Sequence, residues 1–238
     1  AENFPCLPSL RLFACGSGNM PRQNILKLHA WLPHVQFRTV YGLTETSSPA
    51  AIFPDDAALS EYIGSSGYPI PGTQFKICDE SGKILPLGEV GSIFIKGTVV
   101  LSSYYHLETK LLQDGWLDTG DLGYFTEQGF LYIADRKKDM INRGGEKVWS
   151  FDVENTLYSL GGIREAAVVG IPDAVYGEVP AAMIALSPDS NMTSTDIQEL
   201  LKDKLAKFQI PVKIRIVETL PMTPNSKVDK LKIKSLLT

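Results

Sequence analysis

The chain has 238 residues, of which 44% are hydrophobic and 21% charged, and its formal net charge is -4. These proportions are typical of a soluble globular chain of one or two domains, and the mild acidity argues against a nucleic-acid partner. Its apolar runs fall short of the roughly 20 residues that a membrane span needs, so we expect no transmembrane segment.

The three cysteines and the N-terminal sequence indicate the cellular compartment in which the protein works. Cys6, Cys15 and Cys78 have no metal-binding spacing and cannot all pair. We therefore expect small packed apolar thiols and a cytoplasmic protein. The chain opens Ala1-Glu2-Asn3-Phe4-Pro5, without the basic and then apolar stretch of a signal peptide. It also opens without Met, which favours a processed or excised piece.

The first 62 residues have the pattern of an α/β unit. Residues 10–15 and 35–40 are short apolar runs typical of strands, and residues 21–31 between them have helical periodicity. Strand, glycine-rich turn, helix and strand predict a βαβ unit with a parallel sheet. The unit is too small to stand alone, so we expect the end of a sheet that begins earlier.

The pattern changes over residues 63–135, where glycine- and proline-containing turn signals separate short β-type runs. This spacing predicts an antiparallel β-barrel or curled sheet.

A charged stretch at 135–147 then separates two segments that look well packed, as a domain boundary does. Its Gly144-Gly145 pair indicates unusual backbone conformation or a close ligand, with an exposed hairpin as the alternative. Beyond it, periodicity predicts a small α+β domain over 136–238, following a larger part over 1–135. The predicted helices are 151–160, 195–208 (with Ser194 as cap) and 230–237, and the strands are 163–171, 180–187 and 212–217.

Three segments carry side chains suited to binding chemistry. The segment 41–46, Tyr-Gly-Leu-Thr-Glu-Thr, follows a predicted strand at its carboxyl end, where open parallel sheets bind ligands. Its ring, hydroxyl and carboxylate can stack a base, hold a phosphate and hold a hard cation. A packed tyrosine and a helix-capping threonine are the alternative interpretation.

The other two segments also allow two interpretations. A turn at 118–123 places a carboxylate where it could accept ribose hydroxyls, or where it merely forms an Asx-turn. A proline-bounded loop at 220–230 carries Lys227, which could deliver positive charge to a developing anion or be an ordinary surface lysine.

Four motifs occur in order: YGLTET at 41–46, GWLDTGDLG at 115–123, DRKKDMINRGGEKV at 135–148 and LPMTPNSKVDK at 220–230. Through them nearly the whole chain resembles the adenylate-forming superfamily of acyl-CoA synthetases, aryl-CoA ligases, beetle luciferases and peptide-synthetase adenylation domains. The closest likeness is to fatty and medium-chain acyl-CoA synthetases of fatty acid metabolism. The resemblance implies that a carboxylic acid attacks the α-phosphate of ATP, and that the thiol of coenzyme A then displaces AMP.

The resemblance also implies roles for individual residues. Tyr41 would stack on adenine, Thr44 would bind the α-phosphate, Glu45 would hold Mg²⁺ and Lys227 would stabilise the transition state of adenylation. Thr44, Glu45 and Lys227 would thus be catalytic. The nucleotide site implied in this way comprises Gly16, Ser17, Gly18, Tyr41, Gly42, Thr44, Asp121 and Arg136, with Asp121 on the ribose hydroxyls.

For the second half-reaction, Lys138 matches the hinge about which a small mobile domain rotates. Gly144, Gly145 and Lys147 match the coenzyme A site, where Gly145 lets pantetheine pass because a side chain would block it. Ser226 departs from the family by replacing the usual glycine, which implies strain if its φ is positive. Asp118 stands where many relatives carry arginine, so we assign it no ligand role.

The family's upstream phosphate-binding loop is missing, so we expect the N-terminal half to be required and residues 1–238 alone to adenylate poorly. Alternatives to the acid–CoA ligase are a non-catalytic nucleotide- or CoA-binding module, an adenylation unit that serves a carrier protein, and a luciferase-like oxygenase. A binding module would not need Lys227, whose presence favours the enzyme.

Overall fold

The computed structural model of the protein describes residues 5–16, 18, 20–106 and 111–238. It divides into two compact units, Ala1–Lys137 and Lys138–Thr238. The sequence placed the boundary between residues 135 and 136, and the division falls between Lys137 and Lys138.

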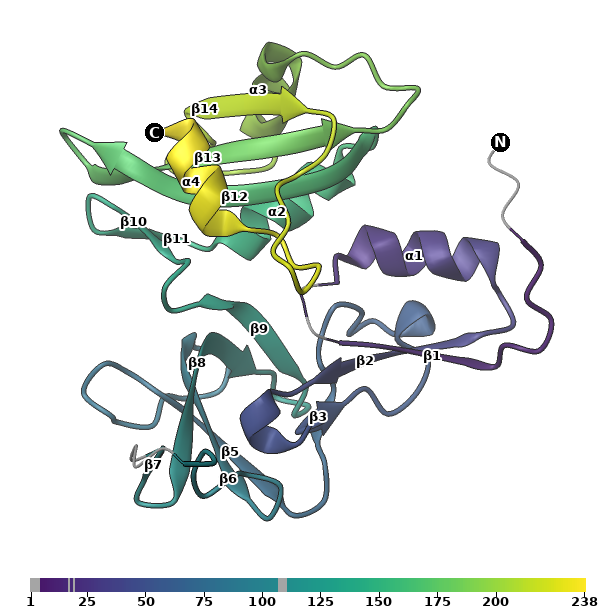
Figure 1. The fold of residues 1–238 in the computed structure, drawn as a ribbon, viewed down its shortest axis with the longest axis vertical. Coiled ribbons are helices and arrows are strands. Elements are labelled where there is room, and N and C mark those ends of the chain that lie inside the picture. Colours follow the sequence, from purple (N-terminus) through teal and green to yellow (C-terminus); the bar gives the residue numbers. More distant parts are fainter. Residues whose placement is uncertain (1–4, 17, 19, 107–110) are drawn as a thin grey trace. The chain divides into compact units, whose positions relative to one another are not determined.

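The first unit begins with a small α/β sheet (Figure 1). Strands β1 and β2 are parallel and are joined through helix α1, so the predicted βαβ unit is confirmed. The remaining pairs, β2–β3 and β3–β4, are antiparallel. The elements are β1 Leu12–Cys15, α1 Arg22–Trp31, β2 Gln36–Tyr41, η1 Thr44–Thr46, β3 Ala51–Ile52, η2 Ala57–Leu59 and β4 Tyr68–Pro69.

The second sheet of this unit is antiparallel and curled, as predicted. Its order is β5-β6-β8-β7, and β9 also pairs with β8. Alternate apolar residues of β5 and β6 point to a core that the end of β2 shares, including Tyr41, Ile77, Ile93 and Ile95. The elements are β5 Thr73–Cys78, β6 Gly91–Gly97, β7 Leu112–Gln113, β8 Trp116–Phe125 and β9 Leu131–Arg136.

The segment 118–123 lies inside β8 and not in a turn between strands, but Asp118 Oδ1 accepts a hydrogen bond from the Gly120 amide at 3.0 Å, which is the Asx-turn of the alternative interpretation. Asp118 pairs with Phe94 and Leu122 with Ser92, so the strand bulges between them. Gly120 supplies a φ of 72° within the bulge. A bulge contains the same glycine and aspartate signals as a turn, but the ladder continues on both sides of it.

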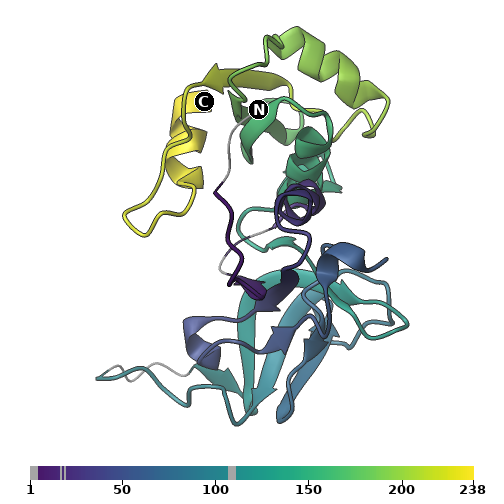
Figure 2. The ribbon, with the colours of Figure 1, turned by 90° about the vertical axis from the view of Figure 1, so that its right-hand side faces the viewer.

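The second unit is a mixed sheet with helices on both faces (Figures 1 and 2). The sheet order is β11-β10-β13-β12, and β14 also pairs with β13. Along β12, Ala166 and Val168 pack on the side of α2 and α3, whereas Ala167 and Val169 pack on the side of α4. The elements are β10 Ile141–Arg143, β11 Glu146–Val148, α2 Ser150–Ser159, β12 Ile163–Asp173, β13 Gly177–Leu186, α3 Ser194–Lys202, β14 Lys213–Val217 and α4 Lys230–Leu237.

Helix α3 differs from its prediction at both ends. Thr193, not Ser194, is the cap, and its hydroxyl accepts a hydrogen bond from the amide of Asp196 at 3.2 Å. The helix ends at Lys202 instead of residue 208. The apolar periodicity continued through Leu205 and Phe208 because these side chains still pack against the core from the turns beyond the helix.

The cysteines differ from one another in exposure. All three are free thiols, but Cys78 alone is buried, Cys15 is half-buried and Cys6 is exposed, so the expectation of three packed thiols was wrong. Within the described part of the chain, no helix combines the length and the apolar character needed to cross a membrane.

Candidate active site

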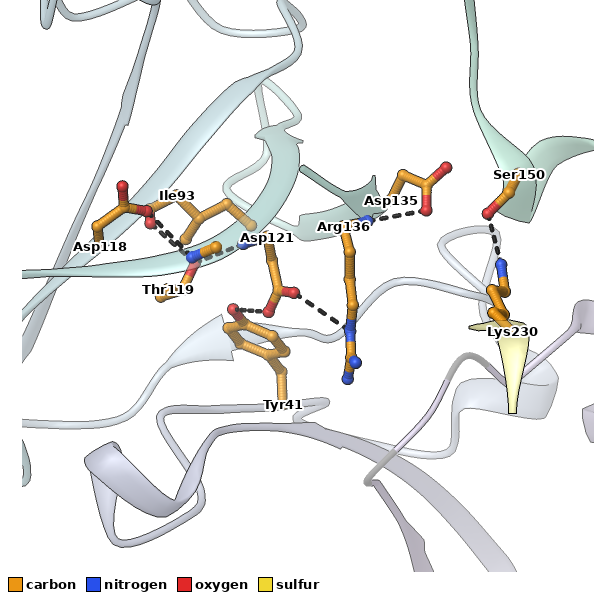
Figure 3. Close-up of polar contacts among 10 residues, drawn as sticks. Tyr41, Ile93, Asp118, Thr119, Asp121, Asp135, Arg136, Ser150 and Lys230 are labelled. Carbon is orange, nitrogen blue, oxygen red and sulfur yellow. Dashed lines mark hydrogen bonds and ion pairs between the residues drawn. The ribbon is translucent and has the colours of Figure 1, made fainter. Parts of the chain in front are cut away.

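Three predicted site residues of the first unit meet around one carboxylate (Figure 3). The hydroxyl of Tyr41, at the end of β2, donates to Asp121 Oδ2 at 2.7 Å. Arg136 Nε lies 3.7 Å from Asp121 Oδ1. The register of β8 and β9 pairs Asp121 with Arg136, so the sheet itself brings these two opposite charges together.

The bulge in β8 sets the position of Asp121. The Asp121 amide donates to Thr119 Oγ1 at 3.1 Å, and that hydroxyl donates to the carbonyl of Ile93 at 2.8 Å. Asp121 is buried, with 7% of its surface exposed. Burial of the phenol, and then the charge of Asp121, raise the pKa of Tyr41 well above its ordinary value. Tyr41 therefore remains a hydrogen-bond donor to this carboxylate at neutral pH.

The ring of Tyr41 belongs to the core of the first unit, and only 9% of the residue is exposed. A stacked adenine would therefore contact the small part of the ring that reaches the surface. The Asp121 carboxylate offers about four lone-pair sites, so ribose hydroxyls could bind it alongside the protein contacts.

Thr44 and Glu45 lie in the short turn η1 that follows β2. Thr46 Oγ1 fixes this turn by accepting from the Leu43 amide at 2.9 Å and donating to the Leu43 carbonyl at 3.0 Å. Thr44 is exposed and Glu45 is half-buried. The Glu45 carboxylate accepts a hydrogen bond from the hydroxyl of Tyr104, a residue that the sequence analysis missed because no local pattern links it to the motif.

Two predicted nucleotide-site glycines have a packing explanation. A Cβ on Gly16 would lie 2.6 Å from Val40 Cγ2 and 3.0 Å from the Val40 carbonyl oxygen, and one on Gly42 would lie 3.1 Å from Pro49 Cα. Both glycines therefore allow close approach of neighbouring backbone. Gly18 has open space around it, and Ser17 lies outside the described residues.

The described residues contain no cluster of three or more His, Cys, Asp or Glu side chains that could hold a metal. A Mg²⁺ ion in this site would be held by the Glu45 carboxylate, together with oxygens of the bound nucleotide. That donor set fits Mg²⁺, which binds through one or two carboxylates and substrate phosphates in many nucleotide enzymes.

The predicted hinge residue lies where the two units divide. Lys137 is still tied to the first unit, because its amide donates to the Gly120 carbonyl at 2.9 Å and its Nζ lies 2.7 Å from Asp118 Oδ2. Lys138 follows in an exposed turn and begins the second unit.

Gly144 and Gly145 form the two-residue turn of the β10–β11 hairpin, so the hairpin alternative describes their backbone. Their φ angles are 60° and 99°, and such turns need positive φ at both positions. A Cβ on Gly144 would lie 3.1 Å from Tyr176 Cδ1, whereas nothing lies within 4 Å of one on Gly145. Lys147 is exposed on β11.

Lys227 lies at the tip of the loop between β14 and α4, in the second unit. The Thr223 amide donates to the Lys227 carbonyl at 2.7 Å, and the Ser226 amide donates to the Thr223 carbonyl at 3.0 Å. Ser226 has a φ of 56°, so the position usually held by glycine is strained here. Lys227 is exposed.

Two known protein families match, between them, most of the chain. Residues 1–105 match the AMP-binding enzyme family, and residues 152–227 match the AMP-binding enzyme C-terminal domain. The chain belongs to the AMP-binding enzymes, the adenylate-forming superfamily. Within that superfamily it corresponds to the C-terminal part, as the motifs predicted.

Relatives of this chain include acid–CoA ligases. The 2-succinylbenzoate–CoA ligase of Bacillus cereus strain Q1 is 35% identical over 241 residues, which cover 100% of this chain and 48% of that protein. The o-succinylbenzoate CoA synthetase of Bacillus subtilis, solved with its acyl-adenylate intermediate, matches with a TM-score of 0.84 at 33% identity, over 96% of this chain and 47% of that one.

The amide bond synthetase of Marinactinospora thermotolerans also shares this fold. It matches with a TM-score of 0.89 at 30% identity, over 96% of this chain and 47% of that one. The chain thus spans about half the length of the relatives it matches.

Proposed function

We propose that this chain is the C-terminal part of an ATP-dependent acid–CoA ligase that forms an acyl-adenylate and then a thioester. The observation that carries the proposal is the exposed Lys227 on an internally bonded loop. A module that only binds nucleotide or coenzyme A would not need a mobile cation in this position.

In the first half-reaction, a carboxylate oxygen of the acid forms a bond to the α-phosphorus of ATP, and pyrophosphate leaves. Asp121 would accept the ribose hydroxyls, Arg136 would reach the ribose or phosphate, and Thr44 would donate to the α-phosphate. Lys227 would stabilise the negative charge that develops on the pentavalent phosphorus. A Mg²⁺ ion at Glu45 would neutralise phosphate charge.

In the second half-reaction, the sulfur of coenzyme A attacks the acyl carbonyl, its proton is lost, and AMP leaves. The open space at Gly145 supports passage of a thin pantetheine arm beside this hairpin turn. Lys147, exposed on the same hairpin, would contact phosphate groups of coenzyme A.

The identity of the carboxylic acid and the identity of the molecule that accepts the acyl group are separate parts of the proposal. The fatty acids suggested by the sequence remain a prediction, and 2-succinylbenzoate, the acid named for the curated relatives, is a second candidate. An amide bond synthetase shares the fold, so an acceptor other than coenzyme A is an alternative, as is a carrier protein. We further propose that the 238-residue chain alone adenylates poorly, and robust pyrophosphate release by it from ATP and acid would contradict this.

The test is Lys227→Ala in the full-length protein, assayed separately for each half-reaction with both classes of acid. Loss of one such electrostatic donor lowers a rate by about 10²–10³-fold. We expect a loss of this size in pyrophosphate release and unchanged thioester formation from preformed acyl-adenylate. Lys207→Ala, which removes another exposed lysine of the second unit, is the matched control.

Other results of these half-reaction assays would favour a different function. Equal losses in both half-reactions would contradict the role of Lys227. A wild-type protein that binds ATP or coenzyme A but turns over neither would indicate the binding module. Adenylate formation without CoA thioester would indicate another acceptor.

A further inference from the structure

The Lys227 loop is rigid within itself, so its direction depends on its two ends. The Asp229 amide donates to the Pro221 carbonyl at 2.9 Å and closes the base of the loop. Above it, Met222 and Val228 form an antiparallel bridge. A loop closed in this way moves as one piece if either end shifts.

Helix α4 starts directly after the loop, and its first residue reaches another helix. Lys230 Nζ donates to Ser150 Oγ at 2.7 Å, a contact shown in Figure 3, and lies 2.8 Å from Glu154 Oε1. Ser150 and Glu154 are one helical turn apart on α2, so both can face the same ammonium group.

The Lys230–Glu154 ion pair is largely shielded from solvent, in contrast to the Lys234–Glu178 pair of the same unit. The side chains of Lys230 and Glu154 are 18% and 8% exposed, whereas those of Lys234 and Glu178 are 42% and 36% exposed. Removing one partner of a buried pair leaves an uncompensated charge, so the pair resists separation.

Glu154 also fixes the sheet. Its Oε1 accepts from the amide of Val168 at 2.9 Å, on β12, which ends the sheet order. One carboxylate therefore connects α2, the edge strand and the first residue of α4. At the other end of the loop, the Leu220 amide donates to Glu165 Oε2 at 3.0 Å, and Glu165 lies on β12. Both ends of the loop are therefore tied to β12, one directly through Glu165 and the other through the Glu154 carboxylate that binds the Val168 amide.

We propose that Lys230 is a positioning residue: through Glu154 and Ser150 it fixes the start of α4 and so directs Lys227 to the charge that develops in adenylation. This inference rests on the proposed function. It assigns Lys230 no contact with substrate.

The test uses Lys230→Met, Lys230→Arg and the control Lys234→Met in the full-length protein. A misplacement of about 1 Å can lower a rate by about 10²-fold, and we expect Lys230→Met to lower kcat for adenylation by up to that amount. The KM for ATP and thioester formation from preformed acyl-adenylate should stay unchanged. Lys230→Arg should restore adenylation, and Lys234→Met should keep it.

Amide hydrogen exchange provides a readout that does not depend on activity. The Lys227 amide donates to Thr223 Oγ1 at 3.2 Å and the Asp229 amide to the Pro221 carbonyl, so both should exchange slowly in the wild type. Lys230→Met should accelerate exchange at both amides, whereas Lys227→Ala should leave exchange at the Asp229 amide slow. If Lys230→Met fails to fold, Ser150→Ala removes one of its contacts and should give a smaller change in the same direction.

Unchanged adenylation in folded Lys230→Met, an equal fall in both half-reactions, or slow exchange in the loop would overturn the proposal. Results that overturn the proposed function can be told apart from results that overturn only the role of Lys230. In the first case the wild type does not adenylate, or Lys227→Ala remains active, while the exchange result still reports whether Lys230 holds the loop.

Discussion

At the residue scale, the buried Asp121 carboxylate takes its position from two side chains that approach from different strands. Tyr41 binds one oxygen at 2.7 Å and Arg136 lies 3.7 Å from the other. Any ribose that binds here would meet an acceptor that is already aligned. Since water does not replace a lost partner easily in a buried site, the Tyr41 hydroxyl contributes to folding as well as to binding.

Tyr41→Phe should therefore lower the free energy of unfolding at pH 7 by about 1–3 kcal/mol, since it leaves a buried acceptor without this donor. Because the pKa of Tyr41 is raised in the folded state, its contribution is full below the unfolded value of about 10 and is lost as pH rises toward the folded value. Denaturant unfolding at pH 7 and above pH 10 would measure both effects.

The difference between wild type and Tyr41→Phe should shrink at the higher pH. Tyr105→Phe is the control, because Tyr105 is 88% exposed. A difference that stays constant over this pH range would contradict the assignment of the shift to Tyr41.

At the element scale, the β10–β11 hairpin explains why two adjacent glycines occur in a charged segment. Both positions need positive φ, and Gly144 also packs close to the Tyr176 ring. Backbone geometry alone therefore accounts for the glycines, whereas the open space beside Gly145 is the feature that supports passage of a ligand.

Comparing Gly145→Ala with Gly145→Leu separates these two explanations. Both variants meet the same strain at a φ of 99°, so both should lower the free energy of unfolding by more than about 1 kcal/mol. Only leucine adds bulk to the open space. We expect Gly145→Leu in the full-length protein to lose thioester formation from preformed acyl-adenylate while keeping adenylation, and Gly145→Ala to keep both.

Single-turnover assays of the two half-reactions and denaturant unfolding would measure these effects. Normal CoA transfer by Gly145→Leu would rule out the passage, and equal losses in both variants would assign the effect to backbone strain.

At the scale of the whole molecule, two units with separate cores are joined at Lys138. Lys137 is held by Gly120 and Asp118 of the first unit, and Ile141 already belongs to the core of the second. The linking segment is therefore short, and a rotation between the units would concentrate in the dihedral angles near Lys138.

Lys138→Pro should restrict this rotation, because proline fixes its own φ and disfavours helical angles at Lys137. We expect the full-length variant to keep one half-reaction and to lose the other, with Lys138→Ala close to wild type in both. Separate assays of adenylation and thioester formation would show this, and normal turnover by the proline variant in both steps would refute the hinge.

Much of the fold followed from local sequence pattern. Alternating and helical periodicities located the βαβ unit, the curled sheet and the terminal helix 230–237, which has the predicted bounds. The sequence pattern predicted the wrong element where two kinds of structure have the same residue pattern. The bulge at 118–122 contains turn residues, and Leu205 and Phe208 keep helical spacing although they lie in turns.

The candidate site followed from motif resemblance, and its roles stay predictions. The sequence by itself determined the family, the order of elements and the identity of the charged groups. Tertiary structure alone decided that Tyr41 donates to Asp121, that Tyr104 binds Glu45 and that Lys230 reaches Glu154. These partners are far apart in the chain, and strand register and helix packing, which no local pattern specifies, bring them together.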